Sequence, residues 1–160
     1  MKHIKRILIL LLVLGCLYGC KTEKEEPQQE MIPTPFTEEE TMEAAQEKVG
    51  FELSLPAGFK PNLIMAYENN MLHAEVKGED ESSVYIRKAP FDERYPDISG
   101  DYNEYKKTDK VVMAKQNVTI RMEDGKVHVA FWQDGDYSYA IGTSAGMTVD
   151  EIIVFVEQIH

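Results

Sequence analysis

Two Asp-Gly pairs constrain the fold of this chain more than any other feature of its sequence. Asp124-Gly125 and Asp134-Gly135 each stand between two stretches in which apolar and polar residues alternate. Asp and Gly tolerate the positive φ angles that a tight two-residue turn between antiparallel strands requires. The two turns therefore predict a three-stranded antiparallel meander over residues 117–141.

The alternation also predicts which side chains share a face of this meander. One face is expected to carry the pairs Met122/Val127, Ile120/Val129, Val118/Phe131, Ala140/Val129 and Ser138/Phe131. The other face collects Arg121, His128, Trp132, Tyr137, Tyr139 and Ile141. That second face carries too many apolar side chains to be fully exposed to solvent. Two interpretations remain open: another layer of the protein covers it, or it lines a groove for a ligand.

Further strands are expected before the meander. Apolar and polar residues alternate over residues 51–55, up to a break at Pro56, and again over residues 83–89 after a charged turn. Residues 63–68 and 71–77 flank Asn69-Asn70, a pair that suits a tight hairpin. The expected cross-strand pairs of this hairpin are Leu63/Val76, Met65/Ala74 and Tyr67/Leu72.

Two helices are predicted from the spacing of a capping box, a Thr followed three residues later by a Glu. In this motif each side chain accepts a hydrogen bond from the backbone N–H of the other residue. Thr37 with Glu40 predicts a helix to about Lys48 that ends at Gly50. Thr148 with Glu151 predicts a final helix that covers the meander. Its apolar stripe is Val149, Ile152, Ile153, Val156 and Ile159. The expected fold class is α+β: an antiparallel meander sheet with an N-terminal and a C-terminal helix packed on one face.

The first 20 residues resemble a bacterial lipoprotein signal. Lys2, Lys5 and Arg6 precede an apolar run that is shorter than the roughly 20 residues of a membrane-spanning helix. The run ends in Leu17-Tyr18-Gly19-Cys20, which resembles a lipobox. That resemblance implies that residues 1–19 are removed and that Cys20 carries a diacylglyceryl group. The protein is then expected at the extracytoplasmic face of the cell membrane, with the lipid as its membrane contact.

Charge and composition divide the rest of the chain. Residues 20–35 hold four glutamates and three prolines with few apolar side chains, which predicts a disordered tether, and residues 36–160 are expected to form one α+β domain. The formal net charge is −11, and loss of Lys2, Lys5 and Arg6 with the signal leaves −14. Such a protein repels phosphate groups, so a nucleic-acid partner is not expected.

A long irregular stretch, residues 90–104, is the expected contact surface. It contains Tyr95 and Tyr102, with Tyr105 at its exit, among five acidic residues. Tyrosine favours recognition because it combines apolar area with a polar tip. The predicted partner-binding residues are Tyr95, Tyr102, Tyr105, Trp132 and Tyr137. The alternative is a loop that packs its rings on its own core.

Neither catalysis nor a cofactor is expected from the motifs. Both cysteines lie at or before position 20, and the four histidines have no metal-ligand spacing. The sequence holds none of the hydrolase, zinc-protease or phosphate-loop motifs. The first hypothesis is therefore a lipid-anchored, non-catalytic binding or sensing module for an envelope protein or peptide. The second is a carrier that encloses a small apolar ligand between sheet and helix.

Three segments resemble a known family. They are Gly50-Phe51-x-Leu53-x-Leu55-Pro56, Asp97-Ile98-Ser99-Gly100-Asp101-Tyr102, and Ala130-Phe131-Trp132-Gln133-Asp134-Gly135-Asp136-Tyr137-Ser138-Tyr139. They are similar to an uncharacterised extracytoplasmic domain, a domain of unknown function, of lipoproteins and anti-sigma-like regulators in spore-forming Gram-positive bacteria. The resemblance implies an α+β fold and the cell envelope, and no activity. The chain departs from the regulators by having a lipobox where they have a membrane-spanning helix.

Replacement of Cys20 tests the lipid anchor. Cells that express the protein should incorporate a radioactive fatty acid into it, and the variant Cys20→Ala should incorporate none, because the acceptor thiol is gone. Two acyl chains, at about 0.8 kcal/mol per buried methylene, hold a protein firmly on a membrane. Unchanged labelling of the variant would contradict the lipoprotein prediction.

Overall fold

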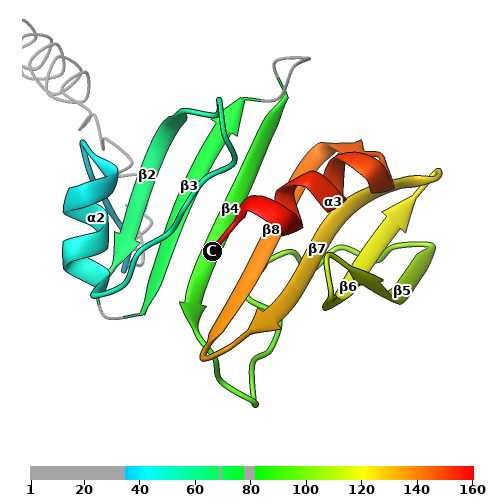
Figure 1. The fold of residues 1–160 in the computed structure, drawn as a ribbon. Coiled ribbons are helices and arrows are strands. Elements are labelled where there is room, and N and C mark those ends of the chain that lie inside the picture. The colour runs from blue at the N-terminus through cyan, green and yellow to red at the C-terminus, as the bar shows by residue number, and fades with distance from the viewer. Residues whose placement is uncertain (1–34, 69, 78–81) are drawn as a thin grey trace, which may run out of the picture. The chain divides into compact units, whose positions relative to one another are not determined.

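The alternating stretches form one antiparallel sheet. The structure is a computed structural model that describes residues 35–68, 70–77 and 82–160 (Figure 1). Eight strands follow the spatial order β1-β2-β3-β4-β8-β7-β6-β5. In chain order they are β1 (Thr37–Glu38), β2 (Pro61–Tyr67), β3 (Met71–Lys77), β4 (Ser83–Pro90), β5 (Lys107–Met113), β6 (Gln116–Glu123), β7 (Lys126–Asp134) and β8 (Tyr137–Met147).

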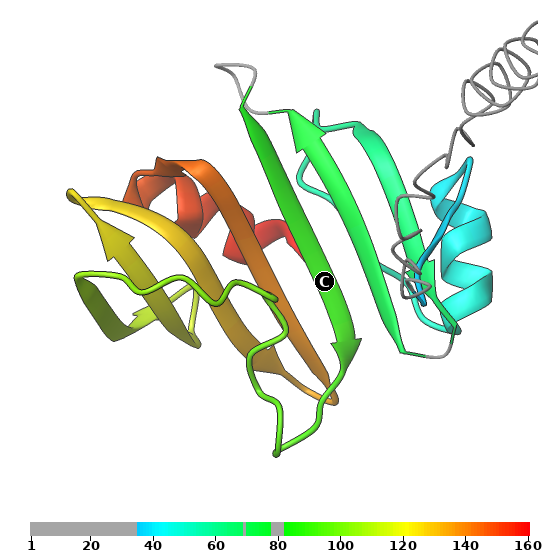
Figure 2. The ribbon, with the colours of Figure 1, turned by 180° about the vertical axis from the view of Figure 1, so that it is seen from behind.

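The sheet consists of two four-stranded meanders joined in its middle. β1 to β4 form the first, β5 to β8 form the second, and β4 pairs with β8 from Val84↔Thr143 to Pro90↔Tyr137. The chain leaves β4 in the middle of the sheet and enters β5 at the far edge. Residues 91–106 make this passage across β8, β7 and β6 (Figure 2). We call this segment the crossing loop.

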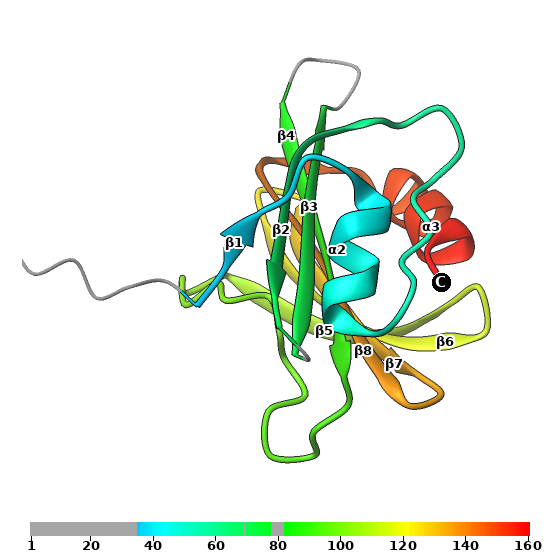
Figure 3. The same cartoon turned by 90° about the vertical axis from the view of Figure 1, so that its left-hand side faces the viewer.

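Two helices cover one face of the sheet, as predicted. α2 (Met42–Val49) packs on the first meander and α3 (Val149–Gln158) on the second (Figure 3). We call this side the helix face and the opposite side the outer face. The core lies between helices and sheet, where α3 contributes Ile152, Phe155 and Val156. The expected α+β class and the expected place of both helices are confirmed.

Both helix ends follow local chemistry, with one correction. Thr148 and Glu151 form the predicted capping box, and Gly50 ends α2 in the left-handed region at φ 80°. The predicted N-cap Thr37 is wrong, because Thr41 caps α2 and accepts a hydrogen bond from the Ala44 amide at 3.2 Å. Thr37 lies instead in β1, where strand pairing with Ala66 takes precedence over the capping pattern.

The first hairpin is present, but its predicted register is wrong by one residue. Leu63 pairs with Glu75 and Tyr67 with Met71, so the connection spans positions 68–70 instead of two residues. A shift of one residue exchanges the two faces of a strand. Ile64 and Ala66 consequently point into the core, and Leu63 belongs to the outer face. Residues 51–55, expected as a strand, belong to none, although Leu53 is buried.

The second meander is present over residues 117–141, with register corrections. Asp124-Gly125 forms the predicted turn with positive φ at both residues, and Met122 pairs with Val127 as expected. Beyond this pair a bulge changes the register, so that Arg121 lies opposite Val129. At the Asp134-Gly135 turn, Asp134 pairs with Tyr137. The register between β7 and β8 therefore differs by two residues from the predicted one, and the side chains of the two strands share the same faces as predicted.

The edge strand β5 was not predicted. It joins β6 through Ala114 and Lys115, both at positive φ without a Gly or Asn to signal the turn. Apart from Pro35, the predicted signal peptide, Cys20 and tether lie outside the described residues. Among the helices described, none is long and apolar enough to cross a membrane.

The packing of α3 can be tested with a pair of variants. Ile152 is 1% exposed and Val154 is 43% exposed on the same helix. Ile152→Ala should lower the free energy of unfolding by about 2–4 kcal/mol, because it leaves a cavity. Val154→Ala should change it by less than about 0.5 kcal/mol. Urea unfolding gives both values, and equal losses would contradict the described orientation of α3.

Candidate functional site

Two arginines hold the crossing loop on the outer face. Arg87 on β4 donates from Nη1 to the carbonyls of Ile98 at 3.2 Å and Ser99 at 2.7 Å. Arg121 on β6 donates to the Asp101 carbonyl at 3.0 Å and forms an ion pair with Asp97 Oδ2 at 2.6 Å. These contacts give loop carbonyls above the sheet the donors that a regular strand would have supplied.

The loop also shapes its own backbone through side chains at alternate positions. The Ser99 amide donates to Asp97 Oδ1 at 2.8 Å, and the Asp101 amide donates to Ser99 Oγ at 3.2 Å. The Asn103 amide continues the series with Asp101 Oδ1 at 2.8 Å. Short oxygen-bearing side chains stabilise such turns by accepting from the backbone two residues ahead. These three hydrogen bonds stabilise the turns of residues 97–103.

A polar cluster lies beneath the loop on strands β3 and β4. Arg87 Nε donates to His73 Nδ1 at 3.0 Å, so that the His73 proton resides on Nε2, which is 3.4 Å from Glu75 Oε1. Burial and then the charge of Arg87 lower the pKa of His73. His73 is consequently neutral at neutral pH, and Glu75 has no full positive charge beside it.

Tyr85 is the aromatic member of this cluster. Its ring stacks on His73, with centroids 5.9 Å apart, and the Arg87 guanidinium lies 5.1 Å from the ring centre. Gly142 on β8 provides the space, since a Cβ at that position would overlap the ring. Burial raises the pKa of Tyr85 to about 12. Its hydroxyl is buried and has no hydrogen-bond partner among the described residues.

The five predicted contact residues separate into two groups. Tyr95 and Tyr102 are 68% and 96% exposed on the crossing loop. Tyr105 is half-buried; its hydroxyl donates to Asp101 Oδ2 at 2.8 Å. Trp132 is only 4% exposed and stacks on a core tyrosine, and Tyr137 packs against Phe51 on the helix face. Only the three loop tyrosines therefore lie together, and Trp132 and Tyr137 are on the opposite side of the sheet.

Tyr137 belongs to a separate arrangement around the buried Lys88, and Trp132 joins it by stacking on Tyr139, whose ring Lys88 also contacts. Lys88 Nζ donates to the Glu52 carbonyl at 2.6 Å and lies 4.5 Å from the Tyr137 ring centre. Burial lowers the pKa of Lys88. This contact fixes residues 51–55 to the sheet. The aromatic part of the predicted second face is covered by protein, since Trp132 and Tyr139 are each 4% exposed, whereas Arg121 and His128 lie on the outer face.

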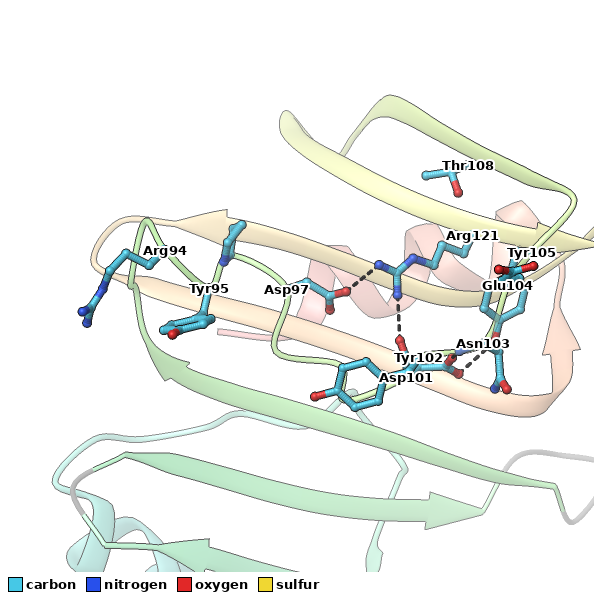
Figure 4. A pocket seen from close by; sticks show the side chains of 11 residues that line it. Arg94, Tyr95, Asp97, Asp101, Tyr102, Asn103, Glu104, Tyr105, Thr108 and Arg121 are labelled. Carbon is cyan, nitrogen blue, oxygen red and sulfur yellow. Dashed lines mark hydrogen bonds and ion pairs between the residues drawn. The ribbon is translucent and has the colours of Figure 1, made fainter.

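Two cavities flank residues 101–105. The first, of about 790 Å³, is walled by Tyr95 and Tyr102 and has the Asp97–Arg121 ion pair at its base (Figure 4). We call it the tyrosine groove. The second, of about 660 Å³, lies between the loop, β4 and β7, and we call it the acidic pocket. Among its lining residues are Glu75, Tyr85, Asp101, Glu104, Tyr105, Glu123 and His128.

The two cavities present charged groups and aromatic rings to solvent. Within the described part of the chain, no three Asp, Glu, His or Cys side chains are grouped to hold a metal ion. Sequence reasoning missed Arg87 and Arg121, which anchor the loop. The alternating Asp97, Ser99, Asp101 and Asn103 were the one local signal for the loop turns.

Removal of the Arg121 guanidinium should release the loop while the sheet stays folded. Hydrogen bonds to charged groups contribute about 1.5–3 kcal/mol. In Arg121→Met the stem still covers Phe131, and hydrogen exchange at the Ser99 and Asp101 amides should accelerate by about tenfold or more. Arg94→Met, which removes an exposed guanidinium of the same loop, should change these rates less than about twofold. Equal rates in both variants would contradict the anchoring.

Comparison with known proteins adds no identity: no family profile, curated protein or solved structure matches the chain. The resemblance to the extracytoplasmic domain consequently stays a prediction. What the protein does has to be argued from its own residues.

Proposed function

We propose that this protein is a lipid-anchored, non-catalytic binding module at the extracytoplasmic face of the cell membrane. Its partner is an envelope protein or peptide, and the contact is made by the tyrosine groove. One observation carries the proposal: Tyr95 and Tyr102 are largely exposed on a loop whose backbone is fixed by Arg87 and Arg121.

Two exposed rings on a fixed loop are suited to recognition. Exposed rings contribute little to the stability of the fold, because their apolar area stays in water. Binding normally costs entropy when a loop becomes ordered, and a loop that is ordered beforehand avoids much of this cost. Tyrosine also loses few rotamers on binding, so it supports affinity at modest entropic cost.

The sequence supports the proposed location. The lipobox-like segment at Cys20 provides the anchor, and the acidic, proline-bearing tether separates the domain from the bilayer. The resemblance to an envelope domain agrees with the same location. A binding module held near the membrane meets partners at a high effective concentration.

The carrier hypothesis has no comparable support. The region between β7, β8 and α3 is occupied by packed side chains, each at most 5% exposed: Trp132, Tyr139, Ile152 and Phe155. The groove on the outer face offers exposed rings and ion pairs instead. For this reason we place the binding surface at the crossing loop.

Site-specific photo-crosslinking tests the proposal in cells that produce the full chain. A photoreactive phenylalanine analogue in place of Tyr95 or Tyr102 should yield the same crosslinked envelope partner. The analogue in place of Val154, which is exposed on α3, should not yield it. A partner captured only from position 154, or none from either loop position, would contradict the proposed surface.

A further inference from the structure

We infer that the partner presents a segment rich in lysine or arginine, which binds across the tyrosine groove and the acidic pocket. The inference rests on the proposed function and specifies the chemistry of its partner. It depends on which charges around residues 101–105 are already balanced within the protein and which are not.

The acidic pocket has an excess of negative charge. Four carboxylates line it, and none of the described residues in its wall is a lysine or arginine. Glu104 is exposed and, like Asp101, forms no ion pair with any residue that the structure describes. Glu75 accepts a hydrogen bond from Ser83 Oγ at 3.0 Å and lies 3.4 Å from Nε2 of His73, which burial and Arg87 keep neutral. Glu123 alone is paired, with Lys106 at 2.5 Å.

The cations of the neighbouring tyrosine groove do not offset this excess. Arg94 contacts both carboxylate oxygens of Asp92, at 3.0 and 2.7 Å, and Arg121 is paired with Asp97. Each positive charge is therefore matched locally. Among the described residues that line the two cavities, the charged groups without an ion pair are Asp101, Glu104 and Glu75, and all three are carboxylates.

Aromatic and hydroxyl groups in the same area complement a cationic side chain. The Tyr102 ring is open to solvent, and a lysine or arginine can lie against its face. Tyr85 lines the acidic pocket with its ring, while its hydroxyl is buried and has no hydrogen-bond partner among the described residues. A basic side chain would thus meet a carboxylate and a ring at one place, which favours a cation over a neutral ligand.

The shape favours an extended chain over a single small cation. The two cavities lie on either side of residues 101–105 and share Asp101, Asn103, Glu104 and Tyr105 in their walls. A peptide that crosses this segment can place one basic side chain in each cavity. The net negative charge of the protein would also accelerate its approach, with a rate that falls as salt is added.

Fluorescence anisotropy with the detergent-purified full chain tests this inference. The probe is a labelled peptide of alternating glycine and lysine, and the same peptide with glutamate in place of lysine is the comparison. The lysine peptide should bind, weaken as salt rises from about 50 to about 500 mM, and exceed the glutamate peptide in affinity. Equal binding of the two peptides, or none, would overturn the inference.

Matched variants separate local recognition from general charge attraction. Glu75→Gln combined with Glu104→Gln should weaken lysine-peptide binding by at least about fivefold, since two carboxylate contacts are lost. The control pair, Glu47→Gln with Glu157→Gln, removes the same charge from exposed positions on the helices. It should change the affinity for the lysine peptide by less than about twofold. Equal effects of the two pairs would overturn the inference. Glu104→Gln alone is informative if the Glu75 change impairs folding.

Peptide binding and crosslinking together distinguish failure of this inference from failure of the proposed function. If crosslinking from Tyr102 captures a partner while the lysine peptide fails to bind, the binding module stands and its basic partner is rejected. If both experiments fail, the proposed surface itself is rejected.

Discussion

The pairing of β4 with β8 is the constraint on which the outer face depends. Because the last strand lies in the middle of the sheet, the chain must travel from β4 to β5 over three intervening strands. A segment that passes over a sheet buries part of its backbone and needs hydrogen-bond partners there. Arg87 and Arg121 provide those partners for the carbonyls of Ile98, Ser99 and Asp101. The loop that carries the exposed tyrosines is thus fixed by the requirements of the topology.

The same arginines link the loop to the interior of the sheet. Arg87 contacts His73 and Tyr85 on the outer face, so its position is set by groups that are themselves buried or stacked. Arg121 lies against Phe131, with its guanidinium carbon 5.3 Å from the ring centre. Each guanidinium therefore links the regular sheet to a loop that has no regular secondary structure. This arrangement suits the proposed binding role, because side chains on a fixed loop need no ordering step at the moment of binding.

Local signals in the sequence predicted the elements, and only part of their arrangement. Alternation identified the strands of both hairpins, and the Thr148 capping box and Gly50 placed helix ends correctly. The position of β8 beside β4 has no local signature, because it depends on residues that are far apart in the chain. For the same reason the arginines were not recognised as anchors: each lies in a strand, and its partners are in a loop elsewhere. The exposure of Tyr95 and Tyr102 agrees with the sequence interpretation, and the burial of Trp132 separates it from them.

One extra residue explains why Arg121 and Trp132 lie on opposite faces of the sheet. In a regular register Arg121 would lie opposite His128 and share a face with Trp132. The register shift between Arg121 and Met122 adds one residue, His128, to β7, and Arg121 then lies opposite Val129 on the outer face. His128 itself reaches the loop, where its ring is 5.7 Å from that of Tyr105. Bulges of this kind redirect side chains near functional surfaces. Strict alternation cannot reveal such a change, so the separation of Arg121 from Trp132 becomes visible only in three dimensions.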